Sequence, residues 1–138
     1  MLWRADRRLR HSRLLRSAVI EDLTKRGQLL KQLREICLPL PECKETLKWG
    51  NPTFVAGRKM FAALDRYHDR WCIAFVATFP DQKRLVAKPG FFPAPYAAKY
   101  GWVCRDAEGK VNWKEMENLL LASYRLVALK RMLAALER

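Results

Sequence analysis

Between residues 27 and 37, apolar side chains recur every three or four positions. This spacing puts them on one side of an α-helix and predicts one helix with a buried stripe. Pro39 and Pro41 follow, and proline cannot continue a helix, so the helix is expected to end near residue 37. The apolar positions are Leu29, Leu30, Leu33, Ile36 and Cys37.

The middle of the chain is patterned as short strands. Segments 53–56, 59–65 and 71–78 are short, apolar and rich in β-branched and aromatic residues, as antiparallel strands are. Turn residues at 57–58 and 67–69 separate them. Alternation is weak between residues 71 and 76, so this strand is expected to be central and covered by helices on one face.

The C-terminal half predicts two more helices with a strand between them. Pro80 suits the first turn of a short helix over 81–86, and a further strand is expected over 102–105. Asn112 is a favourable N-cap, and Glu115 three residues later makes a variant of the capping box. From there one broad apolar side runs to Leu136 and predicts a single last helix.

Residues 90–103 form neither a regular helix nor a plain strand. The segment contains two prolines, two glycines and several aromatic rings, which together predict a shaped loop. Such a loop is either packed onto a core or presented as a surface. The apolar stretch Phe91-Phe92-Pro93 within it could form an exposed patch for a protein partner.

Length and composition favour one domain that needs no disulfide bonds, because half of its 138 residues are hydrophobic. The four cysteines have no zinc-ligand spacing, which favours reduced thiols in a cytoplasmic protein. No apolar run reaches the length of a membrane helix, and no secretory signal is expected at the N-terminus. No metal or other cofactor is predicted.

The net charge is +13, from 27 basic and 14 acidic residues. This charge favours polyanionic partners, nucleic acid first and an anionic membrane surface second. The alternative is a basic protein from an arginine-rich proteome. Residues 1–26 hold eight basic and three acidic residues, with poor apolar periodicity. We expect them to form a basic extension, either a phosphate-binding arm or a solvated tail, before a domain over residues 27–138.

Several short motifs recur in an order typical of one family. They are Leu38-Pro39-Leu40-Pro41-Glu42, Trp49-Gly50-Asn51-Pro52-Thr53-Phe54, Lys59-Met60-Phe61-Ala62, Pro93-Ala94-Pro95-Tyr96, Gly101-Trp102-Val103 and Ser123-Tyr124-Arg125-Leu126-Val127-Ala128. In order and spacing, the set resembles the MmcQ/YjbR family of small bacterial proteins over residues 27–131. The resemblance implies a two-layer α+β fold, an antiparallel sheet with helices packed on it, similar in shape to secretion chaperones. It also implies a DNA-binding role through a double-wing motif. The arginine-rich start is a departure from the family pattern.

The motif aromatics are first candidates for the core, because burying a large ring stabilises a small domain by a few kcal/mol. We expect Trp49, Phe61, Trp102 and Tyr124 to meet between sheet and helices, with Phe54 also in the core. On the proline-rich loop, Pro93 and Pro95 shape the chain around Tyr96 and Tyr100. The hydroxyls of these two tyrosines prefer a partner.

Basic residues near the motifs are candidates for phosphate contacts, with a solvated basic surface as the alternative. They are Lys59, Lys88, Lys99, Arg125, Lys130 and Arg131. Catalysis is not predicted, because His11 and His68 stand alone, and Cys43 or Cys72 would need an activating base.

The sequence therefore predicts a non-enzymatic DNA-binding protein that contacts phosphates through a basic face, with DNA favoured over RNA. The alternative is a protein-interaction adaptor or chaperone-like peptide-binding module. A monomer or weak dimer is expected, without a membrane partner.

Overall fold

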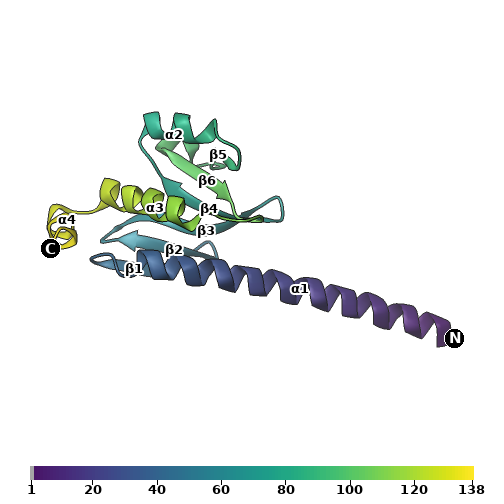
Figure 1. Ribbon diagram of the computed structural model, residues 1–138. Coiled ribbons are helices and arrows are strands. Elements are labelled where there is room, and N and C mark those ends of the chain that lie inside the picture. The colour runs from purple at the N-terminus through teal and green to yellow at the C-terminus, as the bar shows by residue number, and fades with distance from the viewer. Residues whose placement is uncertain (1) are drawn as a thin grey trace.

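The computed structural model describes the backbone of residues 2–138 and the side chains of residues 12–138. A long N-terminal helix is followed by four consecutive strands, then by a mixed segment and two C-terminal helices (Figure 1). In order they are α1 (Leu2–Cys37), β1 (Cys43–Lys48), β2 (Asn51–Ala56), β3 (Lys59–Tyr67), β4 (Arg70–Val76), α2 (Phe79–Val86), β5 (Phe91–Pro93), the short 3₁₀ helix η1 (Ala98–Tyr100), β6 (Trp102–Asp106), α3 (Trp113–Val127) and α4 (Lys130–Leu136).

The six strands form one antiparallel sheet in the order β1-β2-β3-β4-β6-β5. Helices pack on it, so the predicted α+β class is confirmed, as is the interior position of β4. The sequence pattern missed β1, since its side chains are half-buried or exposed and carry no apolar alternation. The loop predicted over 90–103 also contains β5 and η1.

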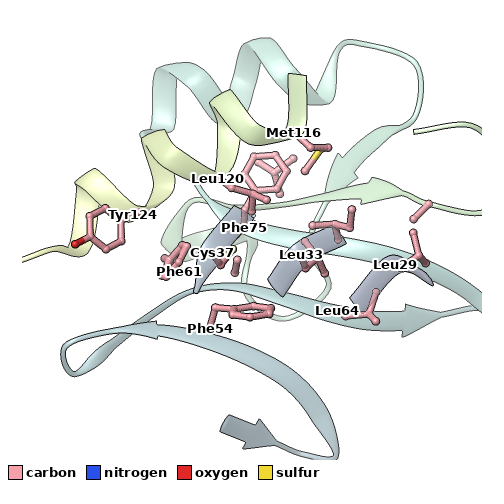
Figure 2. Close-up of a cluster of buried hydrophobic side chains, with 14 of the residues drawn as sticks. Leu29, Leu33, Cys37, Phe54, Phe61, Leu64, Phe75, Met116, Leu120 and Tyr124 are labelled. Atoms are coloured by element: carbon pink, nitrogen blue, oxygen red, sulfur yellow. The ribbon is translucent and has the colours of Figure 1, made fainter. Parts of the chain in front are cut away.

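The core lies between the sheet and the helices (Figure 2). Leu33 and Cys37 of α1 and Leu120 of α3 point toward Phe54 and Phe61 on the strands. Each of these five side chains is fully buried. The amphipathic stripe predicted for residues 27–37 therefore packs as expected on the strands.

The Ser123-Tyr124 motif connects α3 to the rest of the core. Tyr124 packs edge-on against Phe61 with ring centroids 5.6 Å apart, and its hydroxyl donates to the Pro41 carbonyl at 2.7 Å. The Ser123 hydroxyl lies 2.6 Å from the Val76 carbonyl on β4. Both residues are buried with their polar atoms satisfied, which gives the motif a structural role.

Helix α1 begins far earlier than the stripe predicts and runs through Gly27 without a break. Asp22 of α1 accepts hydrogen bonds from Arg66 at 2.6 Å and from the Trp71 indole at 2.9 Å, both on the sheet. Lys25 forms an ion pair with Glu108 at 2.7 Å. Residues 12–21 are exposed, and Figure 1 shows this part of α1 projecting away from the sheet. No described helix, α1 included, is both long and apolar enough to cross a membrane.

The single last helix predicted to reach Leu136 is wrong, because two helices are present. Ala128 has an extended conformation (φ −65°, ψ 146°), and Leu129 caps α4. The break turns α4 so that Met132 becomes fully buried near the Gly57 turn. Upstream, the Asn112 side chain accepts from the Glu115 amide at 3.1 Å, which confirms the predicted N-cap of α3.

Candidate functional site

The sheet face opposite the main core carries a second, smaller buried cluster. It comprises Cys72, Ala74, Ala94, Trp102 and Cys104. Trp102 therefore does not meet Phe61 and Tyr124, contrary to expectation. In the β4–β6 register Trp102 pairs with Val76, and because side chains alternate along a strand, Val103 enters the main core instead.

A pocket of about 410 Å³ opens on this face. Its walls are mostly apolar or aromatic, and its floor is formed by the second cluster and by polar side chains of β2 and β3. The residues around it are Lys48, Trp49, Asn51, Thr53, Met60, Ala63, Asp65, Tyr67, Ala74, Ala94, Pro95, Tyr96, Ala97, Tyr100 and Trp102. The volume falls within the range of about 300–1,000 Å³ typical of small-molecule sites.

Trp49 stands on one rim of this pocket and not in the core, so the expectation for it is wrong. Lys48 pairs with Asn51, which makes Trp49 and Gly50 the two central residues of the hairpin turn between β1 and β2. Both have positive φ, 51° and 78°, as a type I′ turn requires. The Trp49 side chain is 88% exposed. A turn position at the hairpin tip cannot reach the core, and the sequence pattern did not show it because β1 was missed.

Tyr96 occupies the opposite rim at the end of the proline-rich loop. It has a φ of 66° and is 98% exposed, and Tyr100 nearby is 66% exposed. Pro95 lines the pocket and Pro93 ends β5 with an exposed side chain. This loop is held close to the end of β4, since a Cβ on Gly101 would collide with the Ala77 carbonyl oxygen. Residues 93–101 therefore form a shaped loop whose tyrosines face outward.

The floor of the pocket contains a hydrogen-bonded pair. Asn51 donates to Asp65 Oδ1 at 3.0 Å, and the Arg66 amide donates to the same oxygen at 2.7 Å. Tyr67 stands two residues further along β3 on the same face. Burial, and after it the neighbouring Asp65 carboxylate, raise the pKa of Tyr67, so this phenol is neutral over the physiological pH range.

Two lysines border the pocket or its rim aromatics. Lys48 lines the pocket directly, and the Lys99 ammonium lies 5.2 Å from the centroid of the Tyr100 ring. Both are exposed. Within the part of the chain whose side chains are described, neither takes part in an ion pair.

The six basic residues chosen from the sequence do not form one cluster around this pocket. Lys88 pairs with Glu115 at 3.1 Å at the start of α3, and Arg131 pairs with Glu42 at 2.9 Å. Arg125 lies 3.9 Å from Glu137 near the C-terminus. Lys59 and Lys130 are exposed elsewhere, Lys59 at the start of β3 and Lys130 at the start of α4. Of the six, only Lys99 stands beside the rim of the pocket.

The apolar patch expected at Phe91-Phe92-Pro93 is only partly present. Phe91 is buried and packs edge-on against Phe75, with centroids 6.5 Å apart. Phe92 packs in the same way against Tyr67, also at 6.5 Å. The exposed aromatic surface around the pocket is supplied instead by Trp49, Tyr96 and Tyr100.

Among the described side chains, the cysteines and His68 form no recognisable reaction centre. Cys37, Cys72 and Cys104 are buried free thiols, and burial raises the pKa of Cys43 to about 11. His68 lies in an exposed turn, and the side chain of His11 lies outside the described residues. The described side chains contain no group of three residues suited to a metal ion.

Sequence analysis missed most of the pocket floor. Asn51 and Thr53 on β2, and Asp65 and Tyr67 on β3, recur at every second position and so share one face. Polar side chains at alternate positions of two paired strands indicate an open sheet face. That signal was present in the sequence.

Solved structures resemble this fold, and two of them illustrate the likeness. Protein DR2400 from Deinococcus radiodurans, which contains domain DUF419, is 27% identical, with a TM-score of 0.64 over 73% of this chain and 79% of that one. A protein from Pseudomonas syringae is 20% identical, with a TM-score of 0.59 over 70% of this chain and 96% of that one. No curated protein matches the chain. The YjbR family model matches residues 38–126, well over half of the sequence and all six strands, so the chain belongs to the YjbR family.

Proposed function

We propose that this chain is a non-enzymatic DNA-binding protein and that the open face of the sheet is its contact surface. One observation carries the proposal. Two nearly fully exposed aromatic residues, Trp49 and Tyr96, are held in left-handed backbone conformation on opposite rims of one pocket. The β1–β2 hairpin and the 93–101 loop are then two projections that approach the nucleic acid together.

The backbone conformation of these residues supports a role in binding. Positive φ is unfavourable for bulky side chains, and such strain concentrates at ligand sites. Asparagine or glycine would suit the Trp49 position better. An exposed tryptophan contributes little to packing, so the stability of the fold gives no reason for a large ring at this position.

The surrounding charge fits a polyanion. The chain carries a net charge of +13, and Lys48 and Lys99 flank the aromatic residues. Asp65 is the only carboxylate among the pocket residues, and Asn51 and the Arg66 amide both donate to it. Lysines at the rim contact phosphates, while the rings stack on bases or sugars.

Fluorescence anisotropy with a labelled random-sequence DNA duplex, titrated between about 50 and 200 mM salt, tests the proposal. We expect binding at low salt that weakens steeply as salt rises. Replacing Lys48 and Lys99 together by Gln should reduce the slope of log K against log salt by about two units. Lys83→Gln on α2, an exposed lysine away from the pocket, is the control and should leave the slope unchanged. Undetectable or salt-independent binding contradicts the proposal.

A second candidate function is protein interaction through the projecting part of α1. Exposed apolar side chains cluster there, at Leu14, Leu15, Val19, Ile20 and Leu23. Such a patch is typical of a protein contact. Sedimentation velocity over a range of protein concentrations tests it through self-association. A weak dimer abolished by Leu15→Glu supports this candidate, and a monomer at every concentration counts against it.

A further inference from the structure

We propose that the pocket on the open face accepts a single unpaired nucleobase that carries an amino group, with guanine the best fit. The preferred ligand is then DNA with an unpaired or extruded base, and uniform duplex DNA binds more weakly. This inference rests on the DNA-binding function proposed above and names the chemistry of that same site.

The shape of the pocket suits a flat aromatic ring. Its volume of about 410 Å³ exceeds that of one nucleobase, and its lining is mostly apolar. Trp49 and Tyr96 stand on opposite rims, and buried Trp102 contributes to the base of the pocket. Base stacking on aromatic side chains is favourable and independent of sequence, because every base presents a π-face.

The floor of the pocket selects among the bases. Asp65 Oδ1 accepts hydrogen bonds from the Asn51 side chain at 3.0 Å and from the Arg66 backbone N–H at 2.7 Å. The side chain of Asn51 donates its amide to Asp65, which leaves its own carbonyl oxygen as an acceptor. Acceptors on the floor pair with base amino and ring N–H groups. Guanine offers both on its Watson–Crick edge, while thymine offers one N–H between two carbonyls.

A base within an intact duplex cannot enter the pocket, because both of its faces are stacked and its edge is paired. Extruding it costs a few kcal/mol, and the cost is smallest for a base that is already unpaired. The lysines at the rim remain available to the phosphates on either side of the extruded base. The geometry therefore favours DNA lesions, bulges or single strands over regular duplex.

Three labelled DNA probes of one sequence context test this: a fully paired duplex, the same duplex with one unpaired dG, and the same duplex with one unpaired dT. We expect the full-length protein to bind the dG probe about tenfold to a hundredfold more tightly than the paired duplex. The dT probe should fall between them. Binding of the dG probe should also quench tryptophan fluorescence, since a base then stacks on Trp49.

Two variants and one control isolate the pocket. Trp49→Ala should remove most of the preference for unpaired bases, and Asp65→Asn should narrow the difference between dG and dT. Tyr96→Ala provides a second rim variant if Asp65→Asn lowers the melting temperature. Phe79→Ala, which removes an exposed ring outside the pocket, should leave all three affinities within twofold.

Equal, salt-dependent binding of the three probes overturns the base pocket while DNA binding stands. Absence of binding to every probe at low salt rejects the DNA-binding function itself, and the pocket with it. A preference for unpaired bases that survives Trp49→Ala and Tyr96→Ala together also overturns this assignment, because the unpaired base then binds elsewhere.

Discussion

The two faces of the sheet use aromatic residues in opposite ways. On the helix-covered face, Phe54, Phe61 and Tyr124 are fully buried, and their rings pack within regular strands and a helix. On the open face, Trp49 and Tyr96 are 88% and 98% exposed and adopt positive φ. The first set stabilises the fold. The second set is held in place at a cost in backbone conformation, which supports the binding role proposed for it.

Trp102 lies between these extremes. Its side chain lies on the open face of the sheet, yet it is buried, because Ala94 and Ala97 of the adjoining loop pack in the same cluster. Trp102 therefore both lines the pocket and contributes buried apolar area to the stability of the fold. Substitutions on the two faces can therefore be ranked by the loss of stability they cause, from the closed core to the hairpin tip.

The largest effect is expected for Phe61→Ala. The ring is fully buried and packs edge-on against Tyr124, so truncation removes apolar contacts and leaves a cavity. The free energy of unfolding should fall by about 3–5 kcal/mol. Urea denaturation followed by circular dichroism measures it, with the exposed Phe79→Ala as the control that changes little. A loss below about 1 kcal/mol would show that the helix-covered face is not the main core.

An intermediate effect is expected for Trp102→Ala. The ring is buried, but it lies at the floor of an open pocket whose covering loop can collapse toward it. We expect a loss of about 3 kcal/mol, near the lower end of the range for large aromatic truncations. DNA affinity should fall as well, which distinguishes this residue from Phe61 in a variant that remains folded. An unchanged unfolding midpoint would place Trp102 among the purely exposed rim residues.

The difference between the two faces also explains which parts of the fold could be predicted from the sequence. Apolar periodicity predicted β2, β3, β4, β6 and the buried end of α1, because each buries a regular stripe. Periodicity does not distinguish an aromatic ring in a turn from one in a strand, so Trp49 was assigned to the core. The position of Trp49 follows from the pairing of Lys48 with Asn51, a contact between β1 and β2.

Local patterning was also insufficient to predict the contacts of the N-terminal extension, residues 1–26. Its apolar periodicity is poor, and residues 12–21 are exposed in the part of the chain whose side chains are described. The ion pairs and hydrogen bonds of Asp22 and Lys25 involve Arg66, Trp71 and Glu108 far along the sequence. The Arg66 guanidinium lowers the pKa of Asp22, and the Lys25 ammonium lowers the pKa of Glu108. Contacts between residues this distant in the sequence leave no trace in local patterning, whereas the alternate polar positions of the pocket floor do.

The smallest expected effect, and the one of opposite sign, is for Trp49→Asn. Trp49 is the first central residue of a two-residue turn and has a φ of 51°, and Gly50 follows it with a φ of 78°. Asn-Gly is the preferred pair in a type I′ turn, because asparagine adopts positive φ at lower cost than tryptophan does. The exposed ring gives up little buried area, so the free energy of unfolding should rise by about 0.5–1 kcal/mol. Thermal and urea unfolding of this variant beside Trp49→Ala measure the gain, and DNA binding measured in parallel should weaken. If Trp49→Asn is less stable than the parent chain, the Trp49 ring packs on the protein surface and stabilises the fold, and the contrast between the two faces does not hold at this residue.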